Sequence, residues 1–163
     1  MFDALQGFTA SLPEAVQWLG IMLIAAIPFV ESYFGAAIGV IAGIHPVVAI
    51  AAAIIGNTVS MLAFVGAAHK IRERVTRDKE APDPSPRREK LRAAFNKWGV
   101  PGVSLLGQTI LPSQITSGAM VSFGAKTSAV IFWQTISIIL WGAAFGLLAA
   151  LGFGLLTGVP AGG

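Results

Sequence analysis

Apolar residues fall into two long blocks, and each block is interrupted near its centre by polar residues, glycine and proline. In the first block, residues 15–30 are continuously apolar, and a second apolar stretch follows over 34–44. A helix over 15–30 reaches only about 24 Å, which is short of the roughly 30 Å hydrocarbon core of a bilayer. Because Glu31 and a nearby proline separate the two pieces, the pattern predicts a broken or re-entrant helical hairpin over 15–45.

Two further apolar stretches are long enough to span a bilayer as single helices. Residues 47–69 predict a transmembrane helix of about 35 Å, and residues 127–157 predict one of about 46 Å that its glycines would let tilt, kink or divide. Between them, residues 99–124 repeat the short apolar pieces of the first block, broken around Pro112. This second interruption predicts a second broken hairpin.

The two blocks share the same order of elements and a short local similarity. Residues 28–36 can be aligned with 112–119 if a gap of one residue is allowed, and this alignment matches Glu31 with Gln114. If the segment between the blocks lies inside the cell and each block crosses an odd number of times, the blocks have opposite orientations. The expected fold is therefore an all-α integral membrane protein with an inverted repeat, in which sites lie at the midplane between broken elements.

Charge distribution divides this single membrane domain, 1–163, into two halves and a connecting segment. The chain is 55% hydrophobic and only 12% charged, about half of the charge content of a soluble domain. Ten of the eleven Lys and Arg residues lie between 70 and 97. By the positive-inside rule, 70–98 is expected to be a cytoplasmic loop between a first half, 1–69, and a second half, 99–157.

The basic segment is expected to begin with an extended linker over 78–90, because proline recurs at every second position from 82 to 86. A short amphipathic helix follows, with Leu91, Phe95 and Trp98 at helical spacing. It would either lie on an anionic leaflet or pack on the protein's own cytoplasmic face. A multi-pass location in the inner or plasma membrane is expected, with no nucleic acid as a partner. Because the first dozen residues carry no Lys or Arg, no cleaved signal peptide is expected.

Glu31 is the main candidate for function. It is the only formally charged side chain between Ala15 and His69. An ionised carboxylate in hydrocarbon costs at least several kcal/mol, so Glu31 must face protein or a water-filled cavity, or else carry a proton. A carboxyl that exchanges protons there suits a proton-coupled transporter. The other interpretation places Glu31 at a helix end near the headgroups, hydrated and inert.

Glycines and uncharged polar residues accompany Glu31. Gly35, Gly39 and Gly43 recur every fourth residue, which predicts close helix packing or a backbone lining for a substrate path. Around Pro112 and Gly118, also assigned to packing, lie hydrogen-bonding side chains that either bind a substrate or headgroup, or hold a re-entrant turn together. These side chains are Gln108, Thr109, Gln114, Thr116 and Ser117.

Three other polar residues are secondary candidates. Asn57 would either hydrogen-bond between helices or contact the site. His45 would either relay protons with Glu31 or end a helix before Pro46. Lys126 would either snorkel or contact an anionic headgroup. The chain has no cysteine and no clustered histidines, so no metal site, cofactor or thiol chemistry is expected. No nucleophile or phosphate-loop motif occurs, and no enzymatic activity is expected.

Four motifs carry a resemblance to a known family: "IPFVESYFGAAIGV", "IIGN", the basic segment followed by "KWG", and "ILPSQITSGAMVSFG". Together they resemble the small multi-drug export proteins, a bacterial family related to the DedA-type membrane proteins, from about Ala25 to Gly152. The resemblance implies two re-entrant hairpins that enter from opposite sides, and a transport activity. DedA-type proteins are associated with translocation of lipid carriers and with tolerance to drugs linked to the proton-motive force.

The chain departs from the family where arginines are expected. Tyr33 and Phe34 replace an arginine of the first hairpin, and Gln108 and Gln114 lie where the wider group carries arginines. These departures remove the groups that would hold an anionic phosphate. The expected function is proton-coupled export of amphiphilic or cationic small molecules. The alternatives are a lipid or lipid-carrier flippase or scramblase, and a membrane scaffold without transport. A homodimer fits all three.

Overall fold

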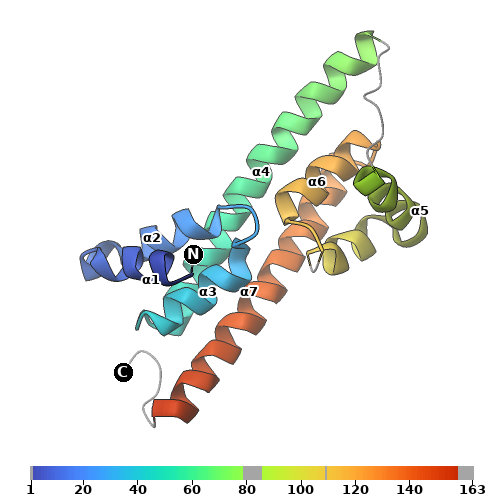
Figure 1. Cartoon of the computed structure of the whole chain (residues 1–163). Coiled ribbons are helices and arrows are strands. Elements are labelled where there is room, and N and C mark those ends of the chain that lie inside the picture. Colours follow the sequence, from blue (N-terminus) through green and yellow to red (C-terminus); the bar gives the residue numbers. More distant parts are fainter. Residues whose placement is uncertain (1, 79–85, 109, 158–163) are drawn as a thin grey trace. The chain divides into compact units, whose positions relative to one another are not determined.

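The computed structural model describes residues 2–78, 86–108 and 110–157, and its regular elements are all helices (Figure 1). Two helical stretches, Pro46–Arg74 and Thr127–Leu156, are long and apolar enough to cross a membrane, and a bent pair of N-terminal helices makes a third if it counts as one span. The expected all-helical fold with apolar helices of membrane-spanning length is therefore confirmed. The elements are α1 (Phe2–Ser11), η1 (Glu14–Val16), α2 (Gln17–Ala25), α3 (Glu31–Ile41), α4 (Pro46–Asp78), α5 (Pro86–Gly107), α6 (Ser113–Ser122) and α7 (Thr127–Thr157).

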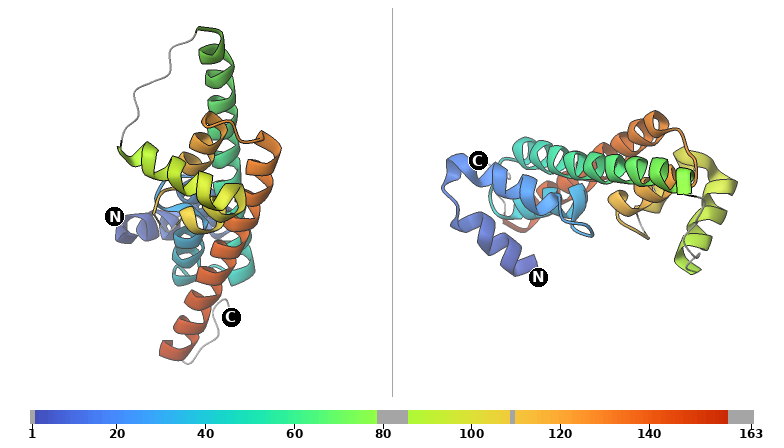
Figure 2. Two further views of the ribbon diagram at one scale, coloured as in Figure 1. Left: turned by 90° about the vertical axis from the view of Figure 1, so that its right-hand side faces the viewer. Right: turned by 90° about the horizontal axis from the view of Figure 1, so that it is seen from above.

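The chain forms two compact units, and both long helices contribute to each. Unit 1 contains the residues up to Val59 together with those from Ile138 onward, and unit 2 contains Ser60–Ser137. Helices α4 and α7, shown in two further views in Figure 2, therefore each pass from one unit into the other. Unit 1 is assembled from both ends of the chain, whereas the expected halves, 1–69 and 99–157, follow chain order.

Helices α2 and α3 of unit 1 form an antiparallel pair that depends on two glycines. A Cβ atom added at Gly35 would lie 2.7 Å from the Cβ of Ala25, and one added at Gly39 would lie 2.8 Å from the Cβ of Ala49 on α4 and 3.1 Å from Ile21 on α2. These distances are too short for any larger residue, so both glycines allow the backbone of α3 to approach its neighbours closely. The predicted packing role of Gly35 and Gly39 is consistent with these contacts.

Helix α7 reaches the same helix, α3, through two glycines of its own. A Cβ at Gly142 would lie 3.1 Å from the Cβ of Ser32, and one at Gly146 would lie 3.2 Å from the Cβ of Ala36. α7 is described as one continuous helix, so these glycines provide packing contacts and do not divide it. In unit 1, α3 is therefore packed against α2, α4 and α7, among buried apolar side chains that include Ile21, Ile24, Val30, Ile38 and Val40.

Gly43 has a different role from the one that its spacing suggested. Its φ is +91°, and a Cβ added there would meet nothing within 4 Å, so the residue does not pack against another helix. Instead it ends α3: its N–H donates to the carbonyl of Val40, and the N–H of Ile44 donates to that of Gly39. This is a Schellman cap, in which glycine is favoured because the left-handed conformation strains other residues.

The second hairpin ends with the same cap. Gly124 has a φ of +106°, its N–H donates to Val121, and the N–H of Ala125 donates to Met120. A long helix follows each cap, α4 after the first and α7 after the second. Counted back from the two cap glycines, the residue that corresponds to Glu31 is Pro112, not Gln114. The two caps match in a register different from the one that the sequence suggested, and the inverted repeat stays a prediction.

The described part of the basic segment is helical, so residues 86–90 of the expected extended linker belong to α5 instead. The cytoplasmic location of 70–98 stays a prediction. α4 continues to Asp78, since no proline occurs in 47–81, and α5 begins at Pro86, where a missing N–H at the first helical position is tolerated. The part of the expected linker at 79–85 lies outside the described residues. The helical segment after it ends where Gly99 leaves the helical conformation, at a φ of 65° and a ψ of −170°.

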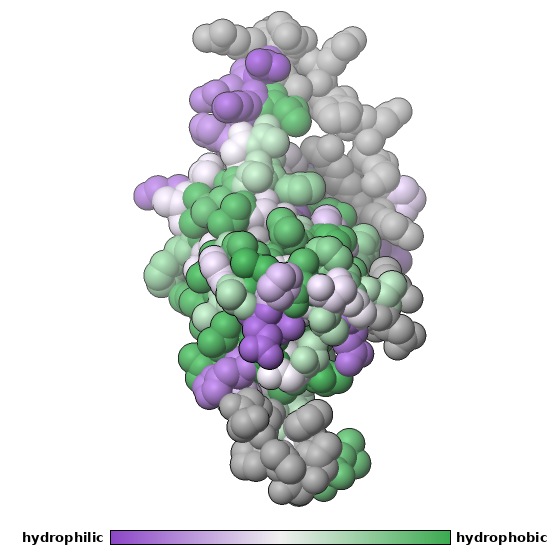
Figure 3. Space-filling view, turned by 90° about the vertical axis from the view of Figure 1, so that its left-hand side faces the viewer, coloured by the Kyte–Doolittle hydropathy of each residue, from purple (hydrophilic) through white to green (hydrophobic). Residues whose placement is uncertain are grey.

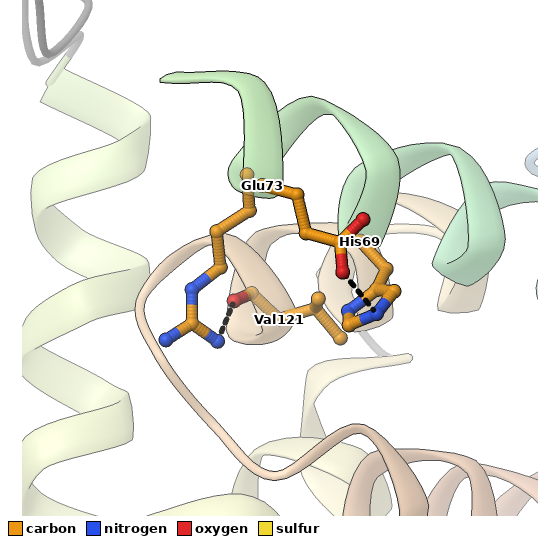
Figure 4. Close-up of polar contacts among 4 residues, drawn as sticks. His69, Glu73 and Val121 are labelled. Carbon is orange, nitrogen blue, oxygen red and sulfur yellow. Dashed lines mark hydrogen bonds and ion pairs between the residues drawn. The ribbon is translucent and has the colours of Figure 1, made fainter. Parts of the chain in front are cut away.

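This amphipathic part of α5 packs on the protein itself, at the end of α6 in unit 2. The ring of Phe95 lies 6.1 Å from that of Phe123, and the guanidinium of Arg92 lies 5.9 Å from the same ring. Close by, Arg72 of α4 donates to the carbonyl of Val121 at 3.4 Å (Figure 4), which places a cation at the negative end of α6. Of the two interpretations of this helix, the structure thus provides contacts for the one in which it packs on its own protein.

The molecular surface is rich in apolar side chains. In Figure 3 hydrophobic residues predominate over the face shown, and hydrophilic residues form smaller patches among them. Many large apolar side chains are more than half exposed, among them Leu23, Val47, Phe132, Leu148 and Leu151. Such a surface is costly in water and is expected of helices that face lipid.

Gly56 and Gly66, both on α4, give a matched test of this packing. A Cβ at Gly56 would collide with the backbone carbonyl of Met22, whereas one at Gly66 would meet nothing within 4 Å. We expect Gly56→Ala to lower the free energy of unfolding by about 1–3 kcal/mol or more. Gly66→Ala should raise it by about 0.5–1 kcal/mol, because alanine is the better helix former.

The measurement is the thermal unfolding midpoint of each purified variant in detergent. Equal midpoints for Gly56→Ala and the wild type would contradict the close approach of α2 to α4.

Candidate functional site

The break between α2 and α3 holds Glu31 in a strained backbone conformation. Phe29 and Glu31 both have a positive φ, 75° and 55°, which residues other than glycine rarely adopt. Each such residue costs about 1–2 kcal/mol and persists only where its surroundings enforce it. Strain of this kind clusters at binding and active sites, which draws attention to the break.

The side chain of Glu31 is fully buried in unit 1. Its exposed fraction is 0%, and Ser32 and Asn57 of the same unit are buried to the same degree. The hydroxyl of Ser32 donates to the backbone carbonyl of Ile138 on α7 at 2.9 Å, and this bond ties the start of α3 to α7. The position of Glu31 therefore differs from the hydrated helix end of the second interpretation. We call residues 26–32 the Glu31 break. Within it the polar side chains of Glu31 and Ser32 are buried, whereas Ile27 and Phe29 are exposed.

Four aromatic rings lie beside this break, and sequence reasoning did not assign them a role. Tyr33 and Phe34 of α3 contact Trp141 and Phe145 of α7, with ring centroids 4.6–6.4 Å apart within the group. The helical spacing of Trp141 and Phe145 was visible in the sequence, but nothing there indicated that they meet α3.

The start of α6 in unit 2 is a second buried polar region. Thr116 donates its hydroxyl to the carbonyls of Pro112 and Ser113, at 3.2 and 3.1 Å, and Ser117 donates to Gln114 at 3.1 Å. These hydroxyls bond to their own helix, as expected if they hold the turn together. The side-chain nitrogen of Gln114 donates to Ser60 of α4 at 3.5 Å, and a Cβ added at Gly118 would lie 3.7 Å from the Cβ of Ala68 on α4.

Two glutamines of unit 2 are buried with no hydrogen-bond partner for either side-chain atom within the described residues. Gln108 of α5 is 5% exposed and Gln134 of α7 is 0% exposed. The hydroxyls of Ser104 and Ser137 are likewise buried with no hydrogen-bond partner within the described residues. A buried amide without a partner costs about 1–3 kcal/mol, so these groups are suited to bind water or a polar ligand. We call these four residues the glutamine group. Thr109, a neighbouring candidate, lies outside the described residues.

His45 and Lys126 lie at the starts of the two long helices, and both are exposed. Each uses its backbone carbonyl in the helix: that of His45 accepts from Val48 and Ala49, and that of Lys126 accepts from Val130. The carbonyl of His45 therefore begins α4, whereas α3 ends earlier, at Ile41. A proton relay with Glu31 stays a prediction. Among the described residues no group of three or more His, Cys, Asp or Glu side chains is placed to hold a metal ion.

Comparisons with protein-family models, with curated proteins and with solved structures found no match for this chain.

Removing the Ser32 hydroxyl tests the bond between α3 and α7. Ser32→Ala should lower the free energy of unfolding by about 1 kcal/mol, because the bond is lost while the Ile138 carbonyl stays buried. Ser122→Ala, at an exposed position where the hydroxyl bonds to its own helix, should change it by less than about 0.5 kcal/mol. The midpoint of denaturation by a denaturing detergent measures the stability of each variant. An equal loss of stability in the two variants would argue against the inter-helix bond.

Leucine substitutions distinguish a glutamine that has a partner from one that does not. Gln134→Leu should leave the free energy of unfolding unchanged or raise it by up to about 1 kcal/mol, because an amide without a partner is replaced by an apolar group of similar size. Gln114→Leu should lower stability, since it breaks the bond to Ser60. The readout is thermal unfolding in the same detergent. A strong destabilisation by Gln134→Leu would mean that the folded protein does provide its amide with a partner.

Proposed function

We propose that the protein is a small membrane transporter that exchanges protons for amphiphilic or cationic small molecules. The observation that carries the proposal is the complete burial of Glu31, in a strained break between two helices too short to span a bilayer. A carboxyl kept at such a place at this cost in strain and desolvation is suited to a functional role.

Charge balance explains how one carboxyl can couple the two fluxes. A buried carboxylate is costly when it is ionised alone, but it is neutral when it holds a proton and close to neutral when it pairs with a cation. It cannot do both at once, because a protonated carboxyl carries no negative charge to pair with the cation. Loading of the cation therefore releases the proton, and the reverse also holds. This competition gives exchange without a second titrating group.

The membrane arrangement proposed with this function has two re-entrant hairpins, α2–α3 and α5–α6, related as an inverted repeat. The matching Schellman caps at Gly43 and Gly124 support the likeness of the hairpins. The basic residues between Lys70 and Lys97 favour a cytoplasmic location for that segment, by the positive-inside rule, in an inner or plasma membrane. The resemblance to small multi-drug export proteins agrees with this assignment, and assembly as a homodimer belongs to the same proposal.

A lipid flippase or scramblase is the second candidate, and the glutamine group favours it. Its four side chains are uncharged hydrogen-bonding groups, which suit a polar headgroup that passes through protein while acyl chains remain in the bilayer. The scaffold interpretation has weaker support, because the Gly39 surface on which it relied is covered by Ala49 and Ile21 of the chain itself. Gly39→Leu would therefore disturb the fold, not a partner interface.

Proteoliposomes with an imposed pH gradient test the function. Wild-type protein should release the gradient when a cationic amphiphile such as ethidium is added, and Glu31→Gln should reduce the rate at least about tenfold, because the amide cannot carry the proton. Glu14→Gln is the matched control, since Glu14 is an exposed acid at the start of η1. It should retain the wild-type rate.

The same vesicles, loaded with a fluorescently labelled phospholipid, discriminate the second candidate. Equal lipid crossing in the wild type and Glu31→Gln, without any release of the gradient by the amphiphile, would refute the exchanger and support the flippase.

A further inference from the structure

The four aromatic rings beside the Glu31 break, which we call the aromatic group, form one continuous set of contacts inside unit 1. Tyr33 lies 5.4 Å from Phe145 and 6.4 Å from Trp141, and Trp141 lies 5.8 Å from Phe145. Phe34 lies 4.6 Å from Tyr33 and 6.2 Å from Phe145. Three of these five pairs are edge-to-face, so the edge of one ring covers part of the face of another.

The four residues of the aromatic group are only partly buried. All four rings are partly exposed, whereas neighbouring apolar residues of α3, such as Ala36 and Val40, are at most 1% exposed. Partial exposure leaves ring surface that a ligand can reach.

The electrostatic character of unit 1 favours a cation at this position. The face of an aromatic ring is negative, and Glu31, two residues before Tyr33, adds a carboxyl to the same end of α3. The sequence of unit 1 contains three acidic residues and no Lys or Arg, because all eleven basic residues fall within unit 2. Neighbouring ring faces and a nearby acid are the combination that recognises organic cations.

We propose that Tyr33, Trp141 and Phe145, with Phe34 behind them and Glu31 beside them, form a subsite for the head of a quaternary ammonium ion. This inference rests on the proposed function and specifies its substrate class. A quaternary head has no N–H donor and is weakly hydrated, so ring faces replace its water at little cost. A primary ammonium would lose strong hydrogen bonds with water that rings do not return, and it is therefore the weaker ligand of this subsite.

Binding of two related amines to the purified full-length protein in detergent tests the subsite. Benzyltrimethylammonium and benzylammonium have the same ring and the same charge, and they differ in the methyl groups on nitrogen. Isothermal titration calorimetry should give the wild type a preference of roughly tenfold for the quaternary ion. Tyr33→Leu and Trp141→Leu should reduce this preference to about twofold or less, because leucine keeps apolar volume but removes the ring face.

Trp133→Leu is the matched control, because Trp133 is a tryptophan on the same helix, α7, whose ring contacts Phe132 outside the aromatic group. It should keep the wild-type preference. Phe145→Leu, a smaller change of volume, provides an independent variant if either larger substitution disturbs the gel-filtration profile. Equal affinity of the wild type for both amines, no measurable binding of either, or a preference that survives in Tyr33→Leu, Trp141→Leu and Phe145→Leu would each overturn the subsite.

Failure of the subsite and failure of the proposed function give different results. The binding assay uses no gradient, so loss of the quaternary preference in the aromatic variants supports the subsite whether or not protons move. If that preference is present and vesicles show no proton release with benzyltrimethylammonium, the subsite stands and the exchanger is wrong. If proton release occurs with other cations while the two amines bind equally, the exchanger stands and the subsite is wrong.

Discussion

Close approach of the α3 backbone to its neighbours is the constraint on which the rest of unit 1 depends. Between helices in lipid there is little hydrophobic driving force, so association relies on van der Waals contact over short distances. Gly35 and Gly39 give α3 these contacts with α2 and α4, while α7 contributes Gly142 and Gly146 from its own side. A short helix that could not span a bilayer alone is thereby held by three others.

This packing explains how the chain tolerates a buried carboxyl and a strained backbone next to each other. The positive φ at Phe29 and Glu31 is unfavourable, and so is the desolvation of the carboxyl. Both are local costs, and they are offset by contacts spread along the helices on either side. A loosely packed hairpin would relax by rewinding the break, which would move Glu31 away from its buried position. The glycines thus contribute to the site although none of them has a functional group.

The sequence predicted those features that depend on local pattern. Long apolar windows indicated α4 and α7, the interruption at Glu31 indicated the break, and glycine spacing indicated close packing. Features that depend on where an element ends were missed: Gly43 continues the glycine spacing but lies just beyond α3, and the basic residues after His69 continue α4. Long-range contacts were also invisible, because nothing local brings Trp141 to Tyr33. Gln134 escaped notice since a single amide hardly changes the character of so apolar a window.

The division of unit 1 between the two ends of the chain has a consequence for biosynthesis. The bond from Ser32 to Ile138 joins residues 106 positions apart, and at 5–20 residues per second a ribosome needs roughly 5–20 s to cover that separation. During this interval the first hairpin is already made, while the α7 surface that covers Ser32 and Ala36 does not yet exist. During this time Glu31 lacks part of the packing that buries it. A nascent chain stalled before Ile138 consequently exposes a first hairpin that lacks part of its packing.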